Sequence, residues 1–174
     1  MNDVNRRNFL GGTALAAVAA TGATKALATT DAPSDSEFQF EIQRSEEEWR
    51  SRLTSDEYRI LREGKTEKRH SSPYVNETRE GVYHCKGCNL AIYDNLWKVP
   101  LDIGWVFFRH SRPRTVLTGI DGEPFVDGDD VRSIVAMEVH CRRCASHLGH
   151  VVHAQGNLVH CINGSSLVFE SAEA

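Results

Sequence analysis

Four of the five cysteines in this 174-residue chain form two Cys-x-x-Cys pairs, and this pattern constrains the fold more than any other feature. The pairs are Cys85 with Cys88 and Cys141 with Cys144, and 52 residues separate them. A two-residue spacer lets a tight turn direct two thiolates at one ion, and two such turns complete a tetrahedron. An all-sulfur ligand set favours zinc, with iron as the usual competitor. We therefore predict one structural zinc ion that joins two distant segments.

Other interpretations of these four cysteines remain open at this point. In an oxidising compartment they could form two disulfides, and a single Cys-x-x-Cys could be a redox motif. The matched spacing, with each pair in a turn after a strand-like run, favours the metal. A zinc ribbon that binds nucleic acid would need a basic face, but the formal net charge is −4. We expect no nucleic-acid partner.

The N-terminus has the pattern of an export signal. Arg6 and Arg7 precede a run of small residues that ends in Ala26-Leu27-Ala28, which is typical of a twin-arginine signal with a cleavage site. A transmembrane anchor is the alternative, but few large aliphatic side chains and Lys25 argue against a span. We expect a periplasmic or secreted protein with no stable membrane insertion after the signal is removed. The predicted parts are a signal peptide at 1–28, a flexible linker at 29–43 and a folded domain at 44–174.

Local signals predict a mainly β domain that begins with two short helices. Ser45 and Thr54 each start a capping box with a glutamate three residues later, and Gly64 is a helix-ending glycine. After Gly64, runs of β-branched and aromatic residues are separated by turn residues. The predicted strands are 81–83, 90–93, 105–108, 131–140, 149–152, 158–162 and 167–169, with loops at 118–124 and 127–129. The length suits one domain.

The fifth cysteine, Cys161, is the candidate nucleophile. A lone cysteine is most often a small buried apolar residue. However, the segment that carries His147 and His150 begins three residues after the second cysteine pair, so a bound metal would fix its backbone. A histidine near a cysteine can lower the pKa of the thiol or supply a proton. We therefore group Cys161 with His147 and His150 as a candidate catalytic cluster.

Taken in order, these motifs resemble the zinc-containing methionine-R-sulfoxide reductase family, MsrB, over about residues 49–169. The resemblance implies a small domain of two antiparallel sheets, described as Mss4-like or β-tent. The matching stretches are 53–62, 66–67, 71–73, 81–88, 104–105, 138–144, 147–151 and 161–164.

The resemblance also implies a reaction, the reduction of methionine R-sulfoxide, free or in proteins, to methionine. The Cys161 thiolate would attack the sulfoxide sulfur and become a sulfenic acid. His147 and His150 match the residues that hold or protonate the oxygen, and Asn163 matches a residue that hydrogen-bonds within the site. Trp105 matches the aromatic wall for the S-methyl group.

Several positions depart from the family pattern. Val106 and Phe107 stand where the family has Pro-Ser, and Val159 and His160 stand where it has Arg-Tyr. On a strand, His160 should point away from the face of Cys161. Val152 stands where the family has a phenylalanine after His-Val, and Ile103 stands where many members have the resolving cysteine.

Because Cys161 would be the only thiol left outside the metal site, we expect a one-cysteine enzyme. We also expect a monomer. A thioredoxin-like protein or a small thiol would reduce its sulfenic acid. Two alternatives remain: a non-catalytic binding module built on the same zinc fold, and a thiol enzyme or sensor that acts on another substrate.

Overall fold

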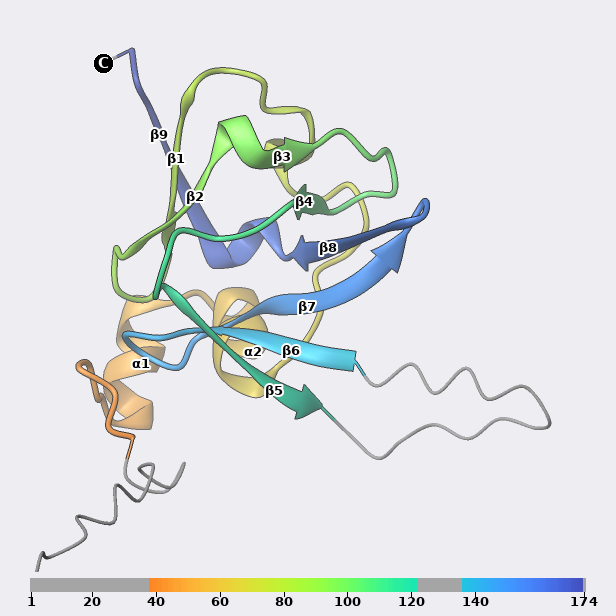
Figure 1. The fold of residues 1–174 in the computed structure, drawn as a ribbon. Helices are drawn as coiled ribbons and strands as arrows, with labels where there is room; N and C mark the ends of the chain where they lie inside the picture. Colours follow the sequence, from red (N-terminus) through yellow and green to blue (C-terminus); the bar gives the residue numbers. More distant parts are fainter. Residues whose placement is uncertain (1–37, 122–135, 174) are drawn as a thin grey trace, which may run out of the picture. The chain divides into compact units, whose positions relative to one another are not determined.

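The computed structural model describes residues 38–121 and 136–173, and residues Gln39–Ala174 form one compact unit. Within the described residues the chain forms two antiparallel sheets (Figure 1). The smaller sheet has the order β2-β1-β9, with β1 Gly81–Cys85, β2 Ala91–Asp94 and β9 Leu167–Ser171. The larger has the order β3-β4-β8-β7-β6-β5, with β3 Lys98–Val99, β4 Val106–Phe108, β5 Val116–Asp121, β6 Ala136–Cys141, β7 His147–Ala154 and β8 Asn157–Ile162. The prediction of a mainly β, two-sheet antiparallel domain is confirmed.

The two predicted helices precede the sheets as α1 (Glu46–Arg52) and α2 (Ser55–Glu63). Both capping boxes form: in each, the N-cap hydroxyl accepts from a backbone N–H and the glutamate accepts from the N-cap N–H. Gly64 ends α2 in the left-handed conformation, with a φ of 64°. Of three short 3-10 helices, η2 (Pro73–Asn76) lies between α2 and β1, whereas η3 (Asn95–Trp97) and η4 (Gly164–Ser166) join strands. Among the described residues, no helix has the length and apolar character needed to cross a bilayer.

An aromatic core lies between the sheets. Tyr93 stacks on Phe108 with ring centroids 4.2 Å apart, and Tyr83 meets Phe108 edge-on at 5.1 Å. Val106 and Ile162 are buried in the same core. Because side chains alternate along a strand, the residues between these positions point to the other face of the larger sheet. That second face carries the candidate site.

The predicted loop at 118–124 is wrong in its first part. Residues 118–121 belong to β5, which pairs with β6 so that Gly119 lies opposite Glu138. The sequence Gly-Ile-Asp-Gly has the composition of a turn, but pairing with a distant strand overrides that local preference. Residues 122–124, the loop at 127–129 and the first half of the strand at 131–140 lie outside the described residues. So do the signal peptide and most of the linker, and these boundaries stay predictions.

Candidate active site and metal centre

The two cysteine pairs converge on one point. Cys85 Sγ lies 3.7 Å from Cys144 Sγ, Cys88 Sγ lies 3.5 Å from Cys141 Sγ, and all four sulfurs lie within 4.8 Å of one another. Four sulfurs about 2.3 Å from a zinc ion would be about 3.8 Å apart at the corners of a tetrahedron. None of the five cysteines forms a disulfide. The cluster could therefore hold a metal ion in the way that the spacing predicted.

The metal-site turns also hold the helices. Arg62 on α2 donates to the carbonyl of Cys144 at 2.9 Å, and Lys86 pairs with Glu57 on α2 at 2.9 Å. Arg44 and Arg62 both place their guanidinium groups over the buried ring of Trp49, at 4.7 and 4.6 Å. A metal bound here would fix the sheets and the helices to each other, because both halves of the cluster contact the helical layer.

Cys161 lies in a row of side chains that crosses the larger sheet. Phe107 on β4 is opposite Cys161 on β8, Cys161 is opposite His150 on β7, and His150 is opposite Glu138 on β6. Residues directly opposite each other share a face and have Cβ atoms about 4.5–5.5 Å apart. Cys161 and His150 are thus neighbours, as the sequence predicted.

A β-bulge brings His147 to the same face. His147 and His150 are three residues apart, so a regular strand would direct them to opposite faces. The register between β6 and β7 shifts next to Val139, which adds one residue and puts both rings on one side. The ring centroids lie 5.2 Å apart, and Nδ1 of His147 lies 2.6 Å from Oε1 of Glu138. At the bulge, Gly149 allows close approach, since a Cβ there would lie 2.1 Å from the carbonyl oxygen of Cys161.

Asn163 and Trp105 are tied together through the backbone of Glu67. The Asn163 amide accepts from Glu67 N–H at 3.0 Å and donates to the carbonyl of Leu148 at 3.1 Å. The indole N–H of Trp105 donates to the carbonyl of Glu67 at 3.3 Å, and Arg69 lies over the ring at 4.8 Å. Asn163 therefore joins β8 to β7 and to the segment that positions Trp105.

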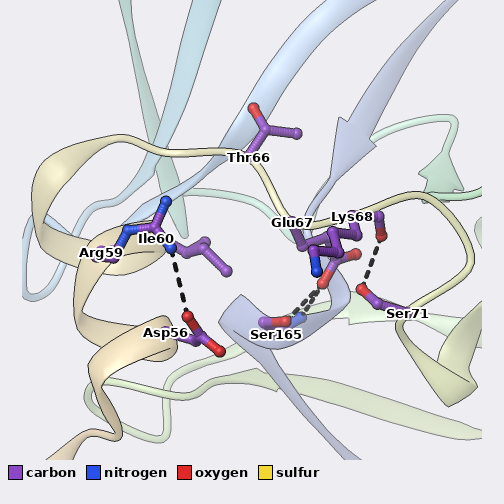
Figure 2. A pocket seen from close by; sticks show the side chains of 8 residues that line it. All are labelled: Asp56, Arg59, Ile60, Thr66, Glu67, Lys68, Ser71 and Ser165. Atoms are coloured by element: carbon purple, nitrogen blue, oxygen red, sulfur yellow. Dashed lines mark hydrogen bonds and ion pairs between the residues drawn. The ribbon is translucent and has the colours of Figure 1, made fainter.

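The Glu67 side chain anchors the turn that follows the candidate nucleophile. Its buried carboxylate accepts from Gly164 N–H at 2.7 Å, Ser165 N–H at 2.8 Å and the Ser165 hydroxyl at 2.6 Å. Figure 2 shows this contact at the edge of a cavity of about 310 Å³, where Asp56 and Arg59 of α2 form the opposite wall. The carboxylate thus fixes η4 directly after Cys161-Ile162-Asn163.

The surroundings of Cys161 favour the neutral thiol. Burial raises the pKa of Cys161 to about 11, and the negative charge of Glu67 adds to this. Phe107 and Val159, which share the face of Cys161, are both buried and apolar. His160 points the other way, as predicted, with Nδ1 3.0 Å from the hydroxyl of Tyr93, and burial lowers the pKa of its ring. It therefore supplies no charge beside the sulfur.

Comparison with known proteins identifies the family. The SelR domain family matches residues 53–171. This chain belongs to the methionine sulfoxide reductase B (MsrB) family. Peptide methionine sulfoxide reductase B3 of Arabidopsis thaliana is 36% identical over 136 residues, which cover 75% of this chain and 72% of that protein.

Bacterial MsrB proteins match at similar levels. Those of Agrobacterium fabrum and Chromohalobacter salexigens are 34% and 36% identical, over 74% and 76% of this chain and 93% and 97% of their own lengths. The solved Mis18 "Yippee-like" domain aligns with a TM-score of 0.43 at 15% identity, over 55% of this chain and 100% of that chain.

The structure brings Cys161, His150 and His147 together on one face, and it links Trp105 with Asn163 through Glu67. The catalytic roles of these residues stay predictions. Sequence reasoning missed two acidic residues, Glu138 and Glu67. Both lie in stretches that match MsrB, and an acidic residue in a strand-like run before a cysteine pair was a usable signal for Glu138.

Proposed function

We propose that this protein reduces methionine R-sulfoxide to methionine, with Cys161 as the nucleophile. The observation that carries the proposal is the direct cross-strand pairing of Cys161 with His150, whose ring contacts that of His147. Membership of the MsrB family supports sulfoxide reduction in general. The stereochemistry and the mechanism are our inference from the matched residues.

The reaction moves one oxygen atom from the substrate to Cys161. The Cys161 sulfur bonds to the sulfoxide sulfur. The protonated oxygen then passes to Cys161 as its bond to the substrate sulfur and the new sulfur–sulfur bond both break, so that methionine leaves and Cys161 becomes a sulfenic acid. The thiol proton ends on the oxygen, so no external proton is needed. Because burial keeps Cys161 protonated near pH 7, a base must receive this proton as attack begins. In this proposal His150, the cross-strand neighbour of Cys161, and His147 beside it receive the proton and return it to the oxygen.

Regeneration requires an external reductant. One thiol condenses with the sulfenic acid and releases water, and a second thiol reduces the resulting disulfide. The other four cysteines are gathered in the metal-site cluster. We infer that a thioredoxin-like protein or a small thiol supplies both thiols.

Substrate binding would use Trp105. The contacts with Glu67 and Arg69 fix its indole, which is half-buried at the start of β4 and offers a wall for the S-methyl group. Either free or protein-bound methionine sulfoxide contains this group. We infer the R epimer from the resemblance.

The metal has a structural role in this proposal. Cys85, Cys88, Cys141 and Cys144 would hold one zinc ion, and the sulfur spacing supports that ligand geometry. The ion would stabilise the fold and take no part in the transfer of oxygen.

We also propose export by the twin-arginine route, with the signal at 1–28, the linker at 29–43 and the domain at 44–174, to a periplasmic or secreted location. Arg6 and Arg7, followed by small residues up to Ala28, support this. Exported proteins meet oxidants that convert exposed methionine to its sulfoxide, so a repair enzyme there is chemically reasonable.

A single-turnover assay tests the function. Pre-reduced protein is mixed with each sulfoxide epimer without any other reductant, and methionine is quantified. We expect about one methionine per protein from the R epimer and none from the S epimer. Cys161→Ser should release none and keep the metal content of the wild type. Turnover by Cys161→Ser would remove Cys161 from its role.

A non-catalytic binding module is the second candidate. The apolar Phe107 and Val159 on the face of Cys161, together with the raised pKa of the thiol, favour it. In this case the reduced protein would release no methionine from either epimer but would still bind a peptide rich in methionine.

A further inference from the structure

The contact between Glu138 and His147 is a short hydrogen bond in the candidate site. Oε1 of Glu138 lies 2.6 Å from Nδ1 of His147, and His147 is only 3% exposed. A distance this short is typical of a hydrogen bond with a charged partner. A carboxylate can only accept hydrogen bonds, so the proton of this bond belongs to Nδ1. The contact thus fixes which ring nitrogen carries a hydrogen.

The second ring nitrogen of His147 has no hydrogen-bond partner. Nε2 is fully buried. Among the described residues it is one of two buried side-chain nitrogen or oxygen atoms without a hydrogen-bond partner. Buried polar atoms in native proteins are nearly always paired, so an unpaired one calls for an explanation. The ring next to that of His147 is that of His150, which is opposite Cys161. A substrate oxygen at Cys161 would supply the missing partner.

We propose that Glu138 is a positioning residue that holds His147 with the hydrogen on Nδ1, so that Nε2 is the nitrogen that exchanges a proton with the sulfoxide oxygen. The inference rests on the proposed function and deepens it. Nε2 must have a free lone pair to receive the proton that Cys161 loses, and it then gives that proton to the oxygen as the sulfur–oxygen bond breaks. The Glu138 carboxylate stabilises the transient imidazolium. In the other tautomer, Nε2 would already carry a hydrogen and could not receive one.

Glu138→Gln tests this role, because a carboxylate can only accept a hydrogen bond from Nδ1, whereas a carboxamide can accept through its oxygen or donate through its NH₂. The glutamine NH₂ can donate to Nδ1 and move the ring hydrogen to Nε2. We expect the single-turnover rate of methionine release to fall about 100-fold or more, within the range for loss of general acid–base catalysis, with substrate affinity changed less than about threefold. Nitrogen-15 spectra of histidine-labelled protein should show hydrogen on Nδ1 of His147 in the wild type and on Nε2 in the variant.

Two further variants separate positioning from folding. Glu138→Asp keeps a carboxylate, so it should restore the Nδ1 hydrogen and recover most of the rate lost in Glu138→Gln. Glu170→Gln is the matched control, because Glu170 on β9 pairs with His84 at 3.2 Å in the smaller sheet. It should react at the wild-type rate. Thermal unfolding and metal content of each variant show whether the fold is intact.

The outcomes distinguish this inference from the proposed function. If the wild type releases methionine and Glu138→Gln does so at an equal rate, the positioning role is overturned and the function stands. If the wild type releases none, the function fails and the proton exchange with the sulfoxide oxygen fails with it, whereas the spectra still decide whether Glu138 holds the hydrogen on Nδ1 of His147. A ring hydrogen on Nε2 of His147 in the wild type would overturn it.

Discussion

Replacing Glu67 should loosen the turn after Cys161 while making the thiol more reactive. Glu67 is 6% exposed, and its carboxylate accepts three hydrogen bonds from Gly164 and Ser165. A hydrogen bond to a charged group contributes about 1.5–3 kcal/mol to stability. Ser165 is only part-buried, so in the variant water can replace some of the hydrogen bonds that the carboxylate accepted. We therefore expect Glu67→Ala to lower the free energy of unfolding by about 3–5 kcal/mol.

Glu67→Gln is the sharper variant, because it keeps the shape and one acceptor oxygen. We expect a loss of about 1.5–3 kcal/mol, which is a large part of the 5–15 kcal/mol that is typical of a domain. Urea unfolding of the metal-loaded protein, followed by circular dichroism, measures it. The negative charge of Glu67 helps to raise the pKa of Cys161. Removal of that charge should therefore lower this pKa, and iodoacetamide at pH 8.5 should modify Cys161 faster than in the wild type.

Asp56→Asn is the matched control for Glu67→Gln. Asp56 lines the same cavity (Figure 2), but its side chain is 87% exposed and pairs with Arg59 at 3.3 Å. An exposed pair of this kind contributes little, so the unfolding free energy should change by less than about 0.5 kcal/mol. If Glu67→Gln matches Asp56→Asn in stability, the buried carboxylate does not hold η4, and the reasoning is refuted.

Two other predictions concern the sulfurs. Removal of the metal with a chelator under reducing conditions should abolish cooperative unfolding, because binding to four thiolates contributes on the order of 10 kcal/mol to folding. Circular dichroism follows the unfolding transition, and a colorimetric assay measures the zinc content. An intact transition in metal-free protein would contradict the structural role of the metal. Alkylation of Cys161 should become about tenfold faster with each pH unit from 7 and level off only near 11, because the pKa is raised to about 11. Mass spectrometry measures the alkylation rate, with Cys161→Ser as the blank. A plateau at pH 8–9 would show that burial does not raise the pKa of Cys161.

Features that depend on short sequence distances could be predicted, and features that depend on long ones could not. The capping boxes at Ser45 and Thr54 and the two cysteine turns are each encoded within four residues, and all of them form. The alternation along β8 also gave the opposite directions of His160 and Cys161. In contrast, the sequence predicts a loop for residues 118–121 of β5, because only their pairing with β6 makes them part of a strand.

The two missed acidic residues illustrate the same limit within the site. Glu67 bonds to Gly164 and Ser165, 97 and 98 residues further along the chain, and nothing near Glu67 in the sequence indicates those partners. Glu138 is nine residues from His147, but the pair forms only because a bulge turns His147 to that face. Neither the bulge between β6 and β7 nor the hydrogen bonds from η4 to Glu67 have a local signal in the sequence. The sequence therefore identifies Cys161 as the candidate nucleophile but not the two acidic residues around it.

The apolar environment of Cys161 makes its chemistry depend on the neighbouring strands. Phe107 and Val159 offer no charge that would favour a thiolate, so in the proposed reaction deprotonation is coupled to attack through the histidines on β7. Those histidines are placed by the register between β6 and β7, and the turn that joins these strands contains Cys141 and Cys144. A metal bound there would therefore support the proposed reaction without touching the substrate, since it fixes the register that places His150 opposite Cys161 and Glu138 opposite His150.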